Sequence, residues 1–418
     1  MVRSALLALI VLLALAGCGS AHDVVLAGQA GEVRASAPRA PEVVAPVDAT
    51  ALRAGNSAFA GRLLGLLVRA QPSMALSPFS ISDALAMTFP GARGETAAQI
   101  AAALDFRLPP ARLRTAFNAL DQSLQSVTGP GVSLSIANAL YGQQGTQFRH
   151  AFMSLLARDY GTGMRIVDFE QHPEAARAAI NTWVSQRTHG KIPALLDAGD
   201  IDTLTRLVLV NAVYLNAKWS SPFDKRDTSP APFHAPGGTV QVPTMHQSGT
   251  FGYVRRAGYR ALELPYRGGR LAFDVLLPDP DQMPSLLHRL ASRGPLALLR
   301  GLRPSYVELS LPKLLLRTRF ELADALRVLG MRLAFEPYRA DLSGIAGPPG
   351  YLYIKRVVHE AYLRVDEAGT EAAAATAVVI NAVSARLAIA FDVDRPFVFI
   401  LRDRKTGAIL FLGTVERP

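Results

Sequence analysis

Apolar residues follow a helical spacing in the first half of the chain and a strand-like spacing in the second half. The first clear helix carries Phe59, Leu63, Leu66 and Leu67 and ends near Gln71. The same spacing predicts further helices at residues 80–90, 94–104, 110–126, 149–159, 173–188 and 320–329. Strands are predicted at residues 133–141, 205–215, 239–245, 259–265, 270–277, 306–311, 351–366, 387–393, 396–402 and 408–415. Early helices followed by late strands favour an α+β fold over an alternating α/β sheet.

The start of the chain has the pattern of an export signal. Arg3 precedes an apolar run, from Ala5 to Ala16, that is too short to span a bilayer. The run continues into Leu-Ala-Gly-Cys at residues 15–18, which resembles the cleavage box of bacterial lipoproteins. Its cysteine, Cys18, is the only one in the chain. We therefore expect lipid to be attached there, and an ordinary cleaved signal with a chance cysteine is the alternative.

This reading divides the chain into three parts. Residues 1–17 are expected to be the signal peptide, residues 18–50 a lipidated cysteine with a flexible tether rich in Ala and Pro, and residues 51–418 the folded domain. The domain would be exported and held at the bacterial cell envelope, in the periplasm or outside the cell. Gly19, which follows the cysteine, favours sorting of the lipoprotein to the outer membrane. With one cysteine, the fold uses no disulfide despite export.

Composition indicates an ordinary globular protein. Half of the 418 residues are apolar, 19% are charged, and the formal net charge is +10. The arginines are scattered and no nucleic-acid motif accompanies them, so we expect no nucleic-acid partner. Arg107, Arg112 and Arg114 are a candidate polyanion patch on a predicted helix, and a solvated face is the alternative.

The sequence carries no recognisable catalytic chemistry. It has no Gly-x-Ser-x-Gly elbow, no glycine-rich phosphate loop and no His-Glu-x-x-His zinc motif. The acidic neighbours Asp366 and Glu367 point to opposite faces if they lie on a strand, so they would not share one site. We therefore expect no enzyme, no metal and no cofactor.

One segment near the end is conformationally ambivalent. The alanine run at residues 372–375 alone predicts a helix, but the β-branched residues Val378, Val379 and Ile380 favour a strand. Gly369 upstream permits a sharp change of backbone direction. With small side chains throughout, such a segment suits a loop, a helix or a buried strand.

The segment Glu-Ala-Gly-Thr-Glu-Ala-Ala-Ala-Ala-Thr, residues 367–376, resembles the hinge of inhibitory serpins. Other motifs of that family occur in the same order along residues 51–418: residues 76–82, 91–96, 211–223, 311–313, 341–344, 394–397 and 410–413. The resemblance implies about nine helices around three β-sheets, with an exposed reactive-centre loop. It also implies a monomer that forms a covalent complex with a target serine protease.

In that family the target cuts the loop, and the cut loop then enters a large sheet as a new strand. Carried onto this chain, the hinge comprises Glu367, Gly369, Thr370, Glu371, Ala372, Ala373, Ala374 and Ala375. The two-residue period of a strand turns Thr370 and every second residue to Ile380 toward the core, and it leaves Glu371 in solvent. A charged side chain at Thr370 would slow insertion, and the inhibitor would become a substrate.

The resemblance also assigns residues that control opening of the sheet. Ser77, Ser80, Asn211 and His359 would form a hydrogen-bonded group called the shutter. Trp219 would lie at the breach, where the loop first enters the sheet. Taken singly, each of these residues also reads as an ordinary core residue.

The family spacing counts sixteen residues from Glu367 and places the reactive bond between Val383 and Ser384. A small apolar residue before the cut suits elastase-like proteases, and Ile380 upstream suits subtilisin-like ones. The competing bond, Arg386–Leu387, would imply a trypsin-like target. The other functional alternative is a non-inhibitory binding protein with the same fold.

Overall fold

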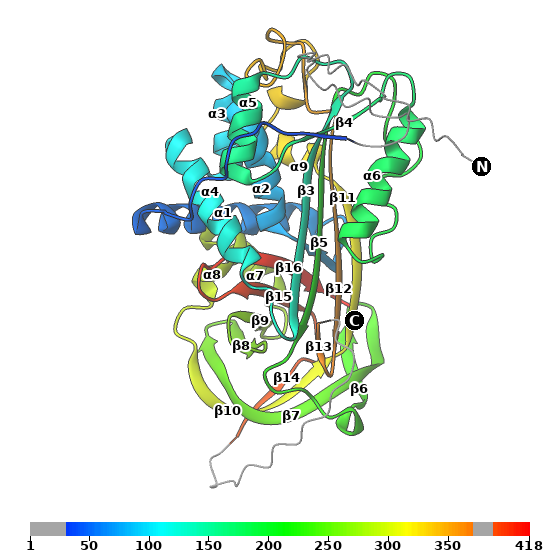
Figure 1. Cartoon of the computed structure of the whole chain (residues 1–418). Helices are drawn as coiled ribbons and strands as arrows, with labels where there is room; N and C mark the ends of the chain where they lie inside the picture. Colours follow the sequence, from blue (N-terminus) through cyan, green and yellow to red (C-terminus); the bar gives the residue numbers. More distant parts are fainter. Residues whose placement is uncertain (1–30, 371–387) are drawn as a thin grey trace, which may run out of the picture.

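The structure is a computed structural model, and it describes residues 31–370 and 388–418. The predictions for Cys18, for residues 371–375 and for both reactive bonds lie outside these residues. Figure 1 shows long strands running down the molecule, with most helices gathered beside their upper part. The helices are α1 (Pro46–Leu67), α2 (Pro78–Thr88), α3 (Gly94–Leu104), α4 (Pro110–Gln125), α5 (His150–Leu155), α6 (Pro173–Arg187), α7 (Met283–Arg293), α8 (Pro295–Leu298) and α9 (Ala323–Val328). The α+β prediction is confirmed.

The first sheet has seven strands in the order β1-β4-β3-β5-β13-β12-β11. Their bounds are β1 (Gly31–Val33), β3 (Val132–Gln143), β4 (Met164–Val167), β5 (Leu207–Lys218), β11 (Leu314–Glu321), β12 (Arg356–Asp366) and β13 (Gly369–Thr370). The central strand β5 is buried along nearly its whole length. Such a near-continuous apolar strand is typical of a sheet covered on both faces.

Different layers cover the two faces of the first sheet. On one face α6 packs against β3 and β5, where Ile180 and Val184 meet Val208 and Val210. Leu209, which alternates with Val208 and Val210, packs instead into the large core that includes α1 and α2. Both faces of β5 are therefore buried, one against the layer of α6 and the other against the layer of α1 and α2.

The second sheet runs in the order β14-β10-β7-β8-β9-β15-β16-β2, with β6 beside β7. Its strands are β2 (Met74–Leu76), β6 (Ser229–Ala235), β7 (Gly238–Arg256), β8 (Tyr259–Pro265), β9 (Leu271–Pro278), β10 (Arg303–Pro312), β14 (Ile389–Asp392), β15 (Phe397–Asp403) and β16 (Ile409–Val415). Three separate sheets were expected, but the described strands join into two. The reason is the long strand β7, which curves around the base in Figure 1 and pairs with β6, β8 and β10.

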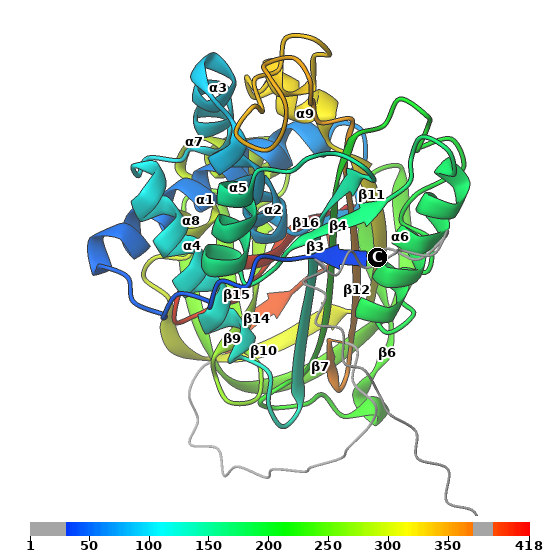
Figure 2. The ribbon, with the colours of Figure 1, turned by 45° about the horizontal axis from the view of Figure 1, so that its top comes forward.

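The N-terminal segment before α1 is packed against the domain. β1 pairs antiparallel with β4, and it extends the first sheet by one strand (Figure 2). Arg39 then donates to Asn118 and forms an ion pair with Asp121 on α4. The tether expected over residues 18–50 therefore does not extend to Thr50, because residues 31–50 already belong to the folded body. Three strand residues are too few to show a period in the sequence.

Candidate functional site

The first sheet is split between β5 and β12. Residues 208–213 of β5 pair in parallel with residues 356–361 of β12. Beyond them, residues 214–216 and 362–364 pair only with their outer neighbours β3 and β11 among the described strands. At the end of the opening the two-residue strand β13 lies between β5 and β12 and pairs antiparallel with both. Among the described residues, the chain therefore begins a new central strand and occupies only its first two positions.

Gly369 makes the reversal from β12 into β13 possible. Its φ of 151° lies in a region that side chains disfavour. A Cβ at this position would lie 2.0 Å from the carbonyl oxygen of Ala217. Only glycine therefore lets the returning chain approach β5 closely enough to pair with it.

Thr370 is buried in the opening, with 1% of its surface exposed. Its hydroxyl lies 2.5 Å from the hydroxyl of Tyr266. Thr370 is thus already buried in the uncut chain, and its place in an inserted loop stays a prediction. Tyr266 was not predicted as a site residue, and a tyrosine in an ordinary strand pattern gives no signal of such a role.

Trp219 lies where the opening begins. Its indole N–H donates to the carbonyl oxygen of Asp366 at 2.9 Å, and its backbone N–H donates to that of Ala368 at 3.0 Å. Its ring stacks on Tyr266 with centroids 4.5 Å apart. The indole thus contacts the last residue of β12 and the partner of Thr370, and the backbone of Trp219 contacts the turn. The breach role that the resemblance implies stays a prediction.

Glu367 anchors the turn between β12 and β13. Lys313 donates to its two carboxylate oxygens at 2.9 and 3.0 Å, and Thr228 donates to one of them at 2.9 Å. Burial opposes ionisation of Glu367, but these hydrogen bonds and one from its own backbone N–H hold its pKa below the usual value. The hinge is therefore fixed at its base by a charged group on a separate element.

Ser77, Ser80 and Asn211 belong to one hydrogen-bond network. His359 joins this network by accepting a hydrogen bond from the backbone N–H of Ser77. The hydroxyl of Ser77 caps α2 by accepting from the N–H of Ser80, and the N–H of Ser77 donates to Nε2 of His359 at 3.0 Å. His359 lies opposite Asn211 in the β5–β12 ladder. The hydroxyl of Ser80 donates to Asn138, and so does the amide of Asn211 at a longer 3.5 Å. The predicted residues therefore meet beneath the parallel ladder that closes the sheet.

Asn138 and Asp83 complete this network and were missed in the sequence. Asn138 lies on β3 and donates to Asp83 at 2.8 Å. The sequence did offer one indication of Asn138, because it is a polar residue inside the largely apolar strand predicted at residues 133–141. Asp83 is buried on α2, where no single spacing links it to the shutter.

The buried shutter groups have shifted pKa values. Burial lowers the pKa of His359 to about 3, so its imidazole stays neutral and Nε2 accepts from Ser77. Burial, with the nearby charge of Asp121, raises the pKa of Asp83 to about 7 against the hydrogen bond from Asn138. One polar atom each of His359, Asn211 and Asp83 has no hydrogen-bond partner among the described residues. Such atoms cost about 1–3 kcal/mol each, so the ladder is least secure at this point.

The connection after α6 covers the open part of the sheet. The ring of His189 lies 5.1 Å from that of Tyr214 on β5, and Lys191 lies 5.7 Å from the ring of Tyr362 on β12. Tyr214 and Tyr362 flank the opening from its two sides. An added strand would therefore pass beneath this connection.

The predicted polyanion patch is neutralised. Arg112 forms an ion pair with Asp48, Arg114 with Asp159, and Arg107 with Asp105. Among residues 31–370 and 388–418, no cluster of His, Cys, Asp or Glu side chains could hold a metal ion. None of the helices in these ranges is long and apolar enough to cross a membrane.

The first sheet is therefore split by the start of β13, with an aromatic group at one end of the opening and a polar network at the other. A family model described as Serpin (serine protease inhibitor) matches residues 54–418. The chain belongs to the serpin family.

Relatives of this chain include a protein named as a protease inhibitor. The chain is 38% identical over 379 residues to the leukocyte elastase inhibitor of Bos taurus, covering 88% of this chain and 99% of the relative. It is 39% identical over 345 residues to a serpin-like protein of Thermococcus kodakarensis, covering 82% and 80%. Among solved structures, the thermophilic serpin tengpin in its native state superposes with a TM-score of 0.84 at 26% identity, covering 93% and 100%.

The two shifted groups of the shutter give opposite pH dependences. The raised pKa of Asp83 stabilises the fold below its unfolded value of 3.8, and this contribution is lost as pH rises toward about 7. The lowered pKa of His359 stabilises the fold above 6.5, and this contribution is lost as pH falls toward about 3. We expect Asp83→Asn to remove the pH dependence that Asp83 causes. The opposite pH dependence of His359 is then no longer offset.

The variant should therefore lose stability between pH 6.5 and 4 more steeply than the wild type, by up to about 1.4 kcal/mol per pH unit. Urea unfolding midpoints at three pH values measure this difference. The same substitution at exposed Asp324, on α9, is the control and should follow the wild type. Parallel profiles for Asp83→Asn and the wild type would contradict the assignment.

Proposed function

We propose that the protein is an irreversible suicide-substrate inhibitor of serine proteases. The observation that carries this proposal is β13, which already occupies the first two positions of a strand between β5 and β12. A target protease would attack the loop after β13 and form an acyl-enzyme on its own serine. The cut loop would then continue β13 down the opening and carry the attached protease with it.

The observed register tells where such a strand would lie. Thr370 is opposite Ala217 on β5 and Val365 on β12. Continued in the same register, residues 371–379 would lie opposite residues 216 to 208 and 364 to 356. The added strand would therefore reach Arg356, where β12 begins, and fill the sheet from end to end.

Insertion would improve the hydrogen bonding of the sheet. β13 is antiparallel to both of its neighbours, whereas β5 and β12 are parallel to each other. One parallel ladder would thus be exchanged for two antiparallel ladders, which are slightly more stable per residue. The shutter must open first, because His359 and Asn211 lie within the parallel ladder.

The register also supports a reactive bond at Val383–Ser384. A strand that ends at residue 379 or 380 leaves three or two residues between the sheet and Val383, whereas Arg386–Leu387 would leave three more. The proposed targets are elastase-like or subtilisin-like proteases, and cleavage at Arg386 would instead mark a trypsin-like target. A non-inhibitory binding role remains the second candidate, but the small, proline-free hinge favours insertion.

Incubation of the chain with elastase-like, subtilisin-like and trypsin-like proteases should give a covalent complex that survives denaturation. Thr370→Arg should abolish the complex while cleavage continues, because it forces a charge into a position that is 1% exposed. Glu371→Arg is the matched control, since strand alternation turns residue 371 to solvent. The mass of the released C-terminal fragment identifies the bond that is cut.

Two results would contradict the inhibitor mechanism. In one, the wild type is cleaved by every protease without forming a complex. In the other, Thr370→Arg and Glu371→Arg trap protease equally well, which would mean that burial of residue 370 has no part in trapping.

The proposal includes a lipid anchor at Cys18 that holds the domain to the cell envelope. Its support is the lipoprotein-like box at residues 15–18 around the only cysteine. Expressed in a bacterium, the wild type should partition into detergent and the membrane fraction, whereas Cys18→Ser should be recovered in the aqueous phase. Equal partition of the two chains would leave the anchor without support.

A further inference from the structure

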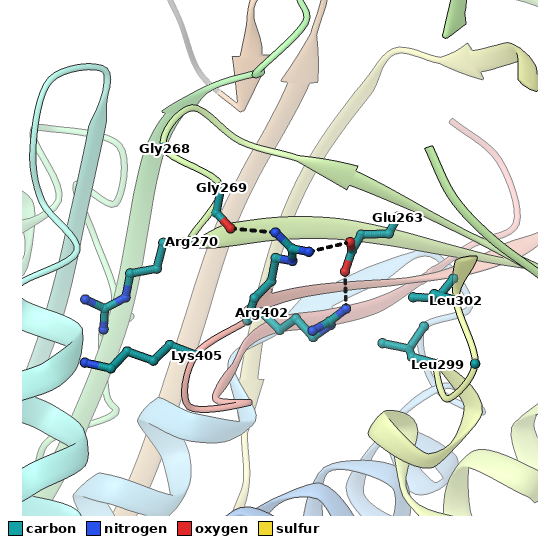
Figure 3. A pocket seen from close by; sticks show the side chains of 10 residues that line it. Glu263, Gly268, Gly269, Arg270, Leu299, Leu302, Arg402 and Lys405 are labelled. Carbon is teal, nitrogen blue, oxygen red and sulfur yellow. Dashed lines mark hydrogen bonds and ion pairs between the residues drawn. The ribbon is translucent and has the colours of Figure 1, made fainter. Parts of the chain in front are cut away.

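A cavity of about 530 Å³ lies at one end of α1. It is bounded by α1, the end of α7, α8 and the turn between β15 and β16. A second cavity of about 610 Å³ adjoins it and shares Leu299, Arg402 and Arg404 (Figure 3). Six arginines and no acidic residue line the first cavity: Arg53, Arg107, Arg293, Arg300, Arg402 and Arg404.

Two of these arginines form a fixed wall. Arg402 binds Glu263 and Asp274, and Arg404 binds Glu263 at 3.2 Å and the carbonyl oxygen of Gly269 at 2.8 Å. Figure 3 shows Arg402 beside Glu263. Because the charges of Arg402 and Arg404 are already paired, these residues form part of the cavity wall but add little net positive charge to it. Arg107 is likewise paired, with Asp105.

The other three arginines are available to a ligand. The side chains of Arg53, Arg293 and Arg300 form no hydrogen bond or ion pair with any residue in the described ranges, and all three are exposed. They come from α1, from the last residue of α7 and from the chain after α8. Three elements therefore bring unneutralised charge to one concave surface.

Arg53 is held in place by a glycine. A Cβ at Gly407 would lie 2.4 Å from Cδ of Arg53, so the arginine stem packs directly on the β15–β16 turn. Gly407 also has a φ of 76°, which glycine adopts without strain. This contact orients the guanidinium of Arg53 toward the cavity and lowers the entropy that binding has to remove.

We propose that this arginine pocket binds a compact ligand carrying two or more phosphate groups. Guanidinium groups match phosphate oxygens with paired N–H donors, which a single ammonium group does not. The cavity volume lies in the range of small-molecule sites. The ligand is either a soluble phosphate compound or the headgroup of a phosphate-bearing lipid, and both present the same group to the three arginines.

The test uses the full chain carrying Cys18→Ser, so that no attached lipid contributes to binding. One arm titrates inorganic pyrophosphate by calorimetry. The other arm sediments the chain with phosphatidylcholine vesicles, with and without phosphatidic acid. The pocket variant is Arg53→Ala with Arg300→Ala. The control is Arg34→Ala, which removes an exposed arginine outside the pocket.

Pyrophosphate should bind the parent chain, and the pocket variant should weaken binding at least tenfold while Arg34→Ala leaves it unchanged. If the parent chain sediments only with phosphatidic acid vesicles and the pocket variant does not, a lipid headgroup is the source. If the parent chain binds pyrophosphate but sediments with neither kind of vesicle, the ligand is a soluble phosphate compound. Both variants should keep the unfolding midpoint of the parent without ligand.

The proposal is overturned if pyrophosphate does not bind, or if Arg34→Ala weakens it as much as the pocket variant. The second result would assign binding to the overall charge of +10. Binding of an extended sulfated polysaccharide without pyrophosphate would also overturn it, because a long polymer does not need the cavity.

Discussion

The parallel ladder between β5 and β12 joins six residue pairs and then stops, although both strands continue. Backbone N–H and C=O groups on buried strands need partners, so a sheet left open in its middle is a stored instability. β13 relieves this instability over two residues only. In the same register, residues 371–373 would pair with residues 214–216 and 362–364 without breaking any ladder, whereas a longer strand would have to separate the six paired residues of β5 and β12. In the proposed mechanism the hinge, the breach and the shutter all act on this exchange.

The hinge and breach residues lie at one end of the opening between β5 and β12, and the shutter residues lie at the other end. At one end Gly369, Thr370 and Trp219 make the first step of insertion part of the resting fold, and Glu367 holds the turn against Lys313. At the other end the neutral imidazole of His359 joins the parallel ladder to α2 through Ser77. In the proposed mechanism, insertion would be prepared at the hinge and restrained at the shutter until the loop is cut.

Local sequence carries the parts of this site that lie on one continuous segment. At the hinge, the small side chains alone predicted a segment that suits a loop, a helix or a buried strand, and the family resemblance assigned it as the hinge. Trp219, Ser77 and His359 were assigned only through the family resemblance, since each alone reads as a core residue. Their contacts join segments more than a hundred residues apart, and no spacing in the sequence encodes such pairs.

Other features depend on packing that the sequence does not show. Asn138 and Asp83 become shutter residues only because β3 lies beside β5 and α2 lies beneath both. The short strand β1 forms by pairing with β4, and its own residues have no strand pattern. The unpaired arginines gather because α1, α7 and α8 meet at one turn, and the candidate patch of Arg107, Arg112 and Arg114 gave no indication of this gathering.

The central claim is that the opening between β5 and β12 receives the cut loop. Comparison of the thermal unfolding midpoint before and after cleavage of the loop tests it most directly. Completion of the sheet should raise the midpoint by about 10 °C or more, because it adds several kcal/mol of stability. A cleaved chain that unfolds at the same temperature as the intact one would show that the loop stays outside the sheet, and the account would fail.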